Sequence, residues 1–223
     1  DWLFVPAAFP DEALRQLGAP RRKVWKFPGI KEDIALAGFS PDPAFRSSLA
    51  VGEDEALVIV RPPATFALYH RFGNPLFHQV LRRLVEVPNA KVVTLARTEA
   101  QKAELRDAGF GEFVYDGPAL DGPQLIAAAD LVVTAGGTMA REAAVLGTPA
   151  VSLFAGRPAA IDLELEKQGK LLVLRNEGDL ERLDVRRKEQ SPVARKGEAL
   201  VREFVDRALY CWRLTARRTH RWL

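Results

Sequence analysis

Short apolar runs rich in β-branched residues alternate with helical patterns along most of the chain, and this alternation limits the fold more than any other feature. It is typical of a parallel sheet that is covered by helices on both faces. The predicted strands are Trp2–Val5, Val24–Phe27, Ala56–Val60, Lys91–Ala96, Glu112–Tyr115, Leu131–Thr134, Ala150–Phe154 and Leu171–Leu174. The predicted helices between them are Leu76–Val87, Glu99–Ala108, Gln124–Ala128, Met139–Leu146 and Ile161–Gln168. The sequence therefore predicts an α/β protein with a doubly wound parallel sheet.

A proline-bearing stretch of mixed composition, Pro28 to Ser48, separates the first two predicted strands from the others. We place a domain boundary there, because no periodic pattern crosses it. We expect residues 1–48 to be the end of an N-terminal domain with an interdomain linker. Residues 49–185 then form the main α/β domain, and residues 186–223 form a basic C-terminal helix and tail.

The net charge of +3 is unevenly distributed. From Arg182 to Leu223 there are 12 Lys and Arg against 5 Asp and Glu, a net +7, which leaves −4 for residues 1 to 181. Apolar residues recur in this tail at spacings of three and four residues, which predicts a helix with one docking face. The residues of this face are Val201, Phe204, Val205, Ala208, Leu209 and Trp212. The arginines beyond this face suit an anionic membrane surface or a nucleic-acid backbone, and a solvated terminal helix is the alternative.

The cysteines, histidines and methionine of the chain limit its expected location in the cell and its expected metal binding. Cys211 is the only cysteine, so no internal disulfide forms, and no apolar run reaches the roughly 18 residues that a membrane-spanning helix needs. We expect a cytoplasmic protein, peripheral to the membrane where the basic tail contacts it. Three scattered histidines and one cysteine lack metal-site spacing, so no metal is expected. The only methionine is Met139, so we expect the chain to be part of a longer protein.

One stretch, "VVTAGGTMAREAAVLGTP", combines a strand, a glycine turn and a helix rich in alanine. Gly136 and Gly137 let the backbone turn sharply and approach a ligand, and Thr138 is expected to cap the helix. Free amides and the helix dipole then suit a diphosphate. Glu142, in the first turns, can accept hydrogen bonds from two neighbouring hydroxyl groups, as on a ribose, or supply favourable charge near the helix start.

A second loop, "RPPATFALYHRFGNP", follows the strand that ends at Val60. Two prolines fix the backbone at the strand exit. Arg61, Tyr69, His70 and Arg71 gather where phosphates or a sugar could be met, because ligands of such sheets bind beyond the carboxyl ends of the strands. For His70, a surface imidazole without a ligand is the alternative.

These motifs carry a resemblance to a known family. "AADLVVTAGGTMAREAAVLGTPAVSLFAG" with "IDLELEKQGKL" resembles the carboxyl-terminal half of glycosyltransferase B-fold proteins. The match is with a family of unknown function, related to UDP-N-acetylglucosamine 2-epimerases and to the peptidoglycan N-acetylglucosaminyltransferase. The loop "RPPATFALYHR" and the opening "VPAAFPDEALRQLGAPRRKVWKFPGIKEDIALAGF" resemble the same family.

The resemblance implies a Rossmann-like domain, residues 49–185, that binds a nucleotide-sugar, commonly a UDP-sugar, with no other cofactor. It implies phosphates at Gly136, Gly137 and Thr138, ribose on Glu142, and the base near the loop from Tyr115 to Pro118. Arg157 and Asp162 would face the sugar.

The implied function is the donor half of a glycosyltransferase-like protein that needs a missing N-terminal domain for catalysis, and no catalytic residue is assigned. The alternatives are a UDP-sugar 2-epimerase-like enzyme, in whose pattern Arg141 replaces the first of two glutamates, and a non-catalytic module whose basic tail binds a membrane or nucleic acid. For the donor half, no nucleic-acid partner is expected.

Overall fold

The computed structural model describes residues 2–64, 74, 76–189 and 197–219. The chain forms two compact units. One unit consists of Asp1–Phe39 together with Ala194–Leu223, and the other of Ser40–Val193.

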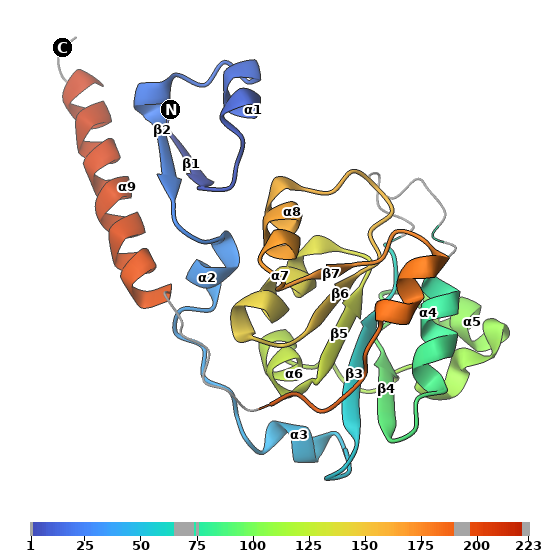
Figure 1. Ribbon diagram of the computed structural model, residues 1–223. Coiled ribbons are helices and arrows are strands. Elements are labelled where there is room, and N and C mark those ends of the chain that lie inside the picture. The colour runs from blue at the N-terminus through green and yellow to red at the C-terminus, as the bar shows by residue number, and fades with distance from the viewer. Residues whose placement is uncertain (1, 65–73, 75, 190–196, 220–223) are drawn as a thin grey trace. The chain divides into compact units, whose positions relative to one another are not determined.

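The larger unit contains a five-stranded sheet in the order β4-β3-β5-β6-β7, with every pairing parallel (Figure 1). The strands are β3 (Ala56–Arg61), β4 (Ala90–Thr94), β5 (Leu131–Thr134), β6 (Ala150–Ser152) and β7 (Leu172–Val173). The central strands β3 and β5 are buried almost throughout, which explains why both are continuous apolar runs. This confirms the predicted α/β class and the parallel sheet.

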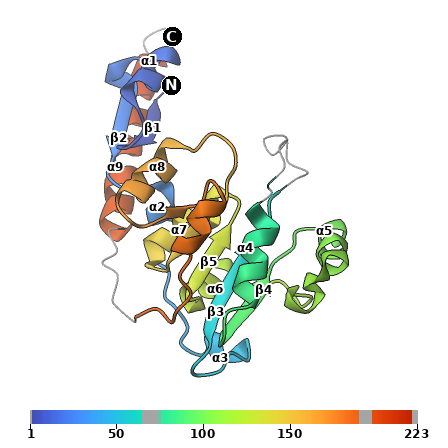
Figure 2. The same ribbon diagram turned by 45° about the vertical axis from the view of Figure 1, so that its right-hand side comes forward.

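Helices cover both faces of this sheet. The helices of the larger unit are α4 (Leu76–Val85), α5 (Glu99–Leu105), α6 (Gly122–Ala128), α7 (Gly137–Leu146) and α8 (Ala160–Lys167), together with α3 (Phe45–Ser48), which packs on α6. Helix α4 buries its apolar stripe against alternate residues of the strands, Val58 and Val133 among them. Helices α6 and α7 lie on the other side of the sheet (Figure 2), where small alanines of α7 allow close approach to β5 and β6.

One predicted strand is wrong. Within Glu112–Tyr115 the chain instead forms a short 3-10 helix, η3 (Gly111–Phe113), after a wide turn η2 (Arg106–Phe110). Gly109 has φ 85 inside η2, a left-handed conformation that glycine adopts at little cost. Only one bridge, between Thr94 and Val114, joins this segment to the edge strand β4. The segment is apolar because it packs beside β4, and that burial resembled a strand pattern.

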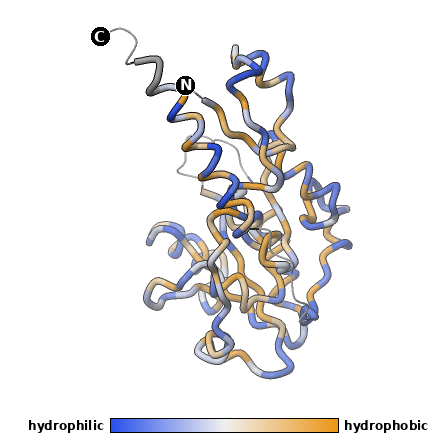
Figure 3. The backbone as a smooth tube through the Cα atoms, turned by 90° about the vertical axis from the view of Figure 1, so that its left-hand side faces the viewer, coloured by the Kyte–Doolittle hydropathy of each residue, from blue (hydrophilic) through white to orange (hydrophobic). Residues whose placement is uncertain are grey.

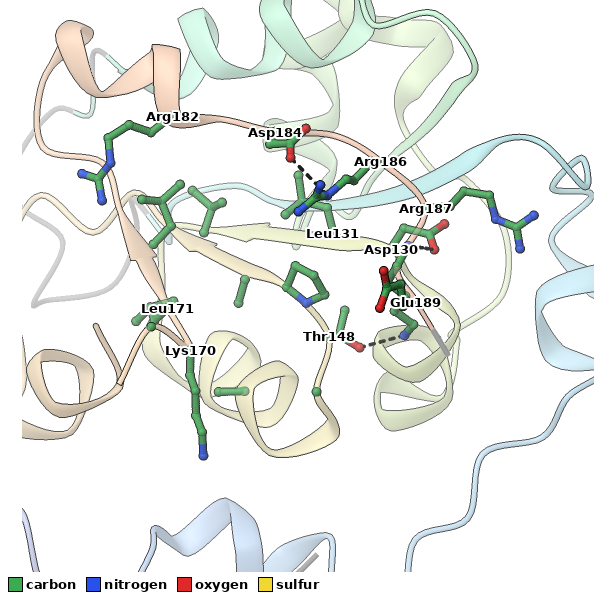
Figure 4. Close-up of a pocket in the computed structure, with 18 residues that line it drawn as sticks. Asp130, Leu131, Thr148, Lys170, Leu171, Arg182, Asp184, Arg186, Arg187 and Glu189 are labelled. Atoms are coloured by element: carbon green, nitrogen blue, oxygen red, sulfur yellow. Dashed lines mark hydrogen bonds and ion pairs between the residues drawn. The ribbon is translucent and has the colours of Figure 1, made fainter. Parts of the chain in front are cut away.

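A buried carboxylate fixes the ends of the larger unit at the amino-terminal edge of its sheet. Asp130 accepts hydrogen bonds from the backbone N–H groups of Leu57 (2.7 Å) and Lys188 (3.1 Å), and it forms an ion pair with Arg46. The Nζ of Lys188 donates to the Thr148 hydroxyl at 3.0 Å. Burial lowers the pKa of Lys188 to about 8. Figure 4 shows this region, a cavity of about 670 Å³ beside the starts of β5, β6 and β7.

The smaller unit is built from both ends of the sequence. Strands β1 (Leu3–Pro6) and β2 (Val24–Phe27) pair in parallel, and helices α1 (Asp11–Gln16), α2 (Lys31–Ala35) and α9 (Gly197–Thr219) complete the unit. The Phe204 ring of α9 lies 5.1 Å from Phe4, 5.6 Å from Trp25 and 5.7 Å from Phe27. The basic helix, predicted as a separate segment 186–223, therefore packs on the strands of the predicted first segment 1–48.

The predicted docking face of α9 is only partly correct. Phe204 packs on the strands, but Val205, Leu209 and Trp212 remain 48%, 45% and 66% exposed. Cys211, which was not included in the predicted face, is buried. Figure 3 shows apolar and polar residues interleaved along this helix. No helix in the described part of the chain is long and apolar enough to cross a bilayer.

Candidate functional site

A cavity of about 590 Å³ lies where the carboxyl ends of β3, β4 and β5 meet. Its walls come from the residues that follow these three strands, from the loop Tyr115–Gly122 and from the first turns of α7. This is the edge at which open α/β sheets bind ligands. The larger cavity of Figure 4 lies at the opposite ends of the strands and contains none of the residues that the sequence singled out.

The glycine turn forms one wall of this cavity. Helix α7 begins at Gly137, and Gly136 is its N-cap, so the expected cap Thr138 lies inside the first turn. The expectation that Thr138 caps the helix is therefore wrong. Gly136 offers no side-chain oxygen to the first-turn amides, which lack intrahelical acceptors in any helix. The amide end of α7 is thus available to an acceptor in the cavity.

The two glycines are needed for different reasons, and neither has a left-handed backbone. Gly136 is extended (φ −142), and among the described residues a Cβ there would meet only Arg97 Nη2 and Thr134 Oγ1, both at 3.9 Å. At Gly137 a Cβ would lie 2.8 Å from Nη2 and 2.9 Å from Cζ of Arg141. Gly136 thus keeps space open in front of the turn, whereas Gly137 admits a guanidinium behind it.

Two arginines form the wall beside the glycine turn. Arg61 ends β3, donates from Nη1 to the Leu95 carbonyl at 3.1 Å, and has its pKa lowered by burial. Arg97 follows β4 and donates from Nη1 to the carbonyl of Pro62. Each arginine therefore ties its own loop to the neighbouring one, and both side chains line the cavity.

Gln101 reinforces this connection between the loops. Its Oε1 accepts from the backbone N–H of Arg97 at 2.9 Å, and its Nε2 donates to the Pro63 carbonyl at 2.8 Å. The residue is buried in the first turns of α5. The loops after β3 and β4 are consequently held at a fixed separation.

Sequence reasoning missed Arg97 and Lys102, although both line the cavity. The hydrogen bond to Asp116 raises the pKa of Lys102, so its ammonium group stays charged at neutral pH. The signal was present in the sequence, because both residues follow the predicted strand at Lys91–Ala96, whose carboxyl end meets the same sheet edge.

Among the described residues that line the cavity, Glu142 is the only carboxylate, and the cations are Arg61, Arg97 and Lys102. It lies four residues after Thr138, so both occupy one face of α7. Because helical side chains lean toward the amino end, the carboxylate is directed back over the first turn. Its position suits hydroxyl groups of a ligand whose anionic part meets the amides.

Tyr115 closes the loop on the opposite wall. Its hydroxyl donates to the Pro118 carbonyl at 2.9 Å, and a Cβ on Gly117 would lie 2.6 Å from its ring carbon Cζ. The tyrosine ring therefore fills its own loop. This loop, from Tyr115 to Leu120, presents a compact surface to the cavity.

The structure brings some predicted site residues together and leaves others apart. Those that share the cavity are Arg61, Tyr115, Gly136, Gly137, Thr138 and Glu142. Arg157 is exposed after β6 and Asp162 binds Arg141, so neither lines it. Tyr69, His70 and Arg71 lie outside the described residues. In the described part of the chain, no three His, Cys, Asp or Glu side chains gather to hold a metal ion.

A family model described as "Protein of unknown function (DUF354)" matches residues 1–207. The chain belongs to this family. DUF354 therefore covers both units, from β1 to the middle of α9. A curated relative, the uncharacterized protein MJ0665 of Methanocaldococcus jannaschii, is 24% identical over 177 residues, which make up 77% of this chain and 50% of that protein.

Solved structures share the fold of this DUF354 chain. The UDP-GlcNAc 2-epimerase of M. jannaschii matches with a TM-score of 0.62 at 16% identity, over 94% of this chain and 62% of that one. A putative UDP-N-acetylglucosamine 2-epimerase of Listeria monocytogenes matches with a TM-score of 0.58 at 19% identity, over 77% of this chain and 46% of that one. Anabaena HepE in complex with UDP-glucose matches with a TM-score of 0.51 at 19% identity, over 81% of this chain and 51% of that one. The chain thus spans about half the length of proteins that it resembles.

Proposed function

We propose that the cavity at the carboxyl ends of β3, β4 and β5 binds a nucleotide-sugar, with a UDP-sugar as the first candidate. The observation that carries this proposal is that Glu142 and the Gly136–Gly137 turn line one cavity with Arg61 and Arg97. Three cations and one carboxylate give the lining a net positive charge that suits a diphosphate. The solved structures with a similar fold support the choice of UDP-sugars, since two are named as UDP-N-acetylglucosamine 2-epimerases and HepE is in complex with UDP-glucose.

Each part of the ligand has a partner in this proposal. The diphosphate meets the amides of the first turn of α7 and the guanidinium groups of Arg61 and Arg97. The ribose hydroxyls donate to Glu142. The base rests against the loop after Tyr115, where backbone groups can read its edge.

We propose further that this chain is the carboxyl-terminal, donor-binding half of a glycosyltransferase-like protein. In the reaction, an acceptor oxygen attacks the anomeric carbon of the sugar while the bond from that carbon to the diphosphate oxygen breaks. The amides and Arg61 stabilise the negative charge that the departing nucleoside diphosphate gains. The acceptor pocket and the catalytic base, which takes the proton of the acceptor hydroxyl, come from a separate N-terminal domain. This is consistent with the half-length match to the relatives.

Titration with UDP and UDP-N-acetylglucosamine tests the binding site. We expect wild-type protein to bind both, and Glu142→Gln to weaken both about tenfold or more by removing a charged acceptor of ribose hydroxyls. Glu104→Gln, on the exposed side of α5, is the matched control and should bind as wild type does. Equal binding by wild type and Glu142→Gln would remove the ribose assignment, and no binding by wild type would remove the function.

The epimerase alternative requires acid and base groups on both sides of a sugar. Arg141 stands at the position of the first glutamate in the epimerase pattern, and its guanidinium is engaged by Asp162. Incubation with UDP-N-acetylglucosamine, followed by analysis of the sugar, decides this point. Formation of the 2-epimer by this chain would overturn the transferase assignment and keep the binding site.

The exposed apolar residues of α9 favour a second role, peripheral membrane contact. Val205, Leu209 and Trp212 are exposed beside Arg213. Vesicles containing anionic lipid should bind wild-type protein and lose affinity for Trp212→Ser, because the indole supplies most of the buried apolar area. Equal binding of both proteins to these vesicles would overturn the membrane role. If Trp212→Ser instead lowered the affinity for nucleic acid, a nucleic-acid role would replace the membrane role.

A further inference from the structure

An ion pair joins α7 to α8 next to the candidate site. Arg141 Nε donates to Asp162 Oδ1 at 2.7 Å, and Nη2 donates to Oδ2 at 3.0 Å. The two side chains are only 18% and 13% exposed. A two-point contact of this kind fixes both the position and the plane of the guanidinium, and partial burial protects it from screening by salt.

The same guanidinium packs on the backbone of the glycine turn. Arg141 lies one helical turn after Gly137, and a Cβ on Gly137 would lie within 2.9 Å of its Cζ. A hydrogen atom is therefore the only substituent that fits between this backbone and the guanidinium. Arg141 is held between Asp162 on one side and the start of α7 on the other.

Asp162 reaches the cavity only through this contact. It belongs to the first turn of α8, and no residue of α8 is among those that line the cavity. Both of its carboxylate oxygens accept hydrogen bonds from Arg141, which belongs to α7. Among the described residues, the contact that links Asp162 to the cavity wall is therefore the one with Arg141, which lies against the backbone at Gly137.

We propose that Asp162 is a positioning residue, which holds Arg141 against Gly137 and so fixes the amide-bearing first turn of α7 for the diphosphate. This rests on the proposed nucleotide-sugar site and goes beyond it, because it makes diphosphate affinity depend on a helix outside the cavity. It also gives Asp162 a role different from direct contact with the sugar. The nucleoside part of the ligand, which lies farther along α7 and at the Tyr115 loop, does not depend on this pair.

The ratio of the affinities for UDP and uridine tests the proposal. Asp162→Asn removes the charge and turns one acceptor into a donor that faces the guanidinium, so we expect UDP to bind about tenfold more weakly. Uridine should bind as it does to wild type. Glu166→Gln is the matched control, because it breaks another ion pair of α8, with Arg175, that does not touch α7. A merely structural role would lower stability in both variants and leave the ratio unchanged.

Two further measurements complete the experiment. The double variant Arg141→Gln with Asp162→Asn should lower the affinity for UDP no more than either single change, since both act through one contact. Amide exchange at Gly137 to Met139 should accelerate in Asp162→Asn and not in Glu166→Gln, whether or not a ligand binds. Failure of the wild-type protein to bind UDP would overturn the proposed function, and amide exchange would still test the role of Asp162. An unchanged UDP to uridine ratio with unchanged exchange, or additive losses, would overturn the role of Asp162.

Discussion

Arg46 Nη1 and Asp130 Oδ2 lie 2.8 Å apart, in an ion pair that ties the segment before β3 to the start of β5. Asp130 is almost fully buried, and its oxygens also accept backbone N–H groups on β3 and at Lys188. Its removal would therefore leave a guanidinium and several donors without their acceptor.

We expect Asp130→Ala to lower the free energy of unfolding of the larger unit by about 3 kcal/mol, because breaking a buried pair leaves an uncompensated charge. Urea denaturation measures the change. Asp184→Ala breaks the exposed pair with Arg186 and should cost less than about 0.5 kcal/mol. Similar losses in the two variants would contradict the central role of Asp130.

Lys188 predicts a pH dependence of stability. Burial lowers its pKa to about 8, against 10.5 in the unfolded chain, so the unfolded state binds more protons between these pH values. Stability from this group is therefore lowest below pH 8 and rises as the pH increases toward 10.5. The free energy of unfolding of wild type minus that of Lys188→Met should increase across this range in urea denaturation. A flat difference would show that the ammonium group is not desolvated.

The two adjacent glycines should respond differently to alanine. Gly137→Ala should destabilise the larger unit by about 1–3 kcal/mol, because the methyl group collides with Arg141. Gly136→Ala should cost at most about 1 kcal/mol, since the site is open and its backbone is extended. Thermal unfolding measures both. UDP titration should nevertheless show weaker binding to Gly136→Ala, and wild-type affinity in that variant would place the ligand elsewhere.

Arg97 should contribute to phosphate binding. Arg97→Gln is expected to weaken UDP about 10- to 100-fold, the value of a hydrogen bond to a charged group in a shielded site, and to reduce the dependence on salt. Arg106→Gln is the control, because Arg106 pairs with Asp116 and does not line the cavity. Isothermal titration at two salt concentrations compares them. Equal losses would mean that only the overall charge matters.

Phe204 should protect the thiol of α9. Cys211 is buried, and Phe204 packs on β1 and β2 through three ring contacts. Phe204→Ala removes this anchor at a cost of about 3–5 kcal/mol to the smaller unit, so Cys211 should react faster with a thiol reagent. Leu209→Ala, at an exposed position of the same helix, should leave the labelling rate unchanged. Equal acceleration would indicate that α9 is not held by Phe204.

Much of the fold could be predicted because burial leaves a direct mark on the sequence. Leu131–Thr134 was predicted with the observed bounds, since a strand that is buried throughout is a continuous apolar run. Val24–Phe27 was also predicted with the observed bounds, although it is only partly buried and contains Lys26. Glu112–Tyr115 misled because an apolar segment packed beside an edge strand has the same composition. The partners of α9 could not be predicted because Phe204 contacts strands that lie far from it in the sequence, and local spacing does not report such a contact.

The candidate site was predictable in part for a similar reason. The glycine turn and Glu142 follow one strand closely, so their shared cavity could be inferred from local pattern. Arg97 was missed because a lone arginine after a strand resembles any solvated charge. The pairing of Asp162 with Arg141 depends on how two helices pack, and no local pattern reports that contact.

The smaller unit joins residues 1–39 to residues 194–223, and this sets an order of events during synthesis. The larger unit can fold as soon as residue 193 has left the ribosome, whereas β1 and β2 must wait for α9. Until then Phe4, Trp25 and Phe27 lack the ring of Phe204 that covers them. The nascent chain therefore carries an uncovered aromatic patch until α9 has been synthesised, and a chaperone that recognises aromatic residues could bind it.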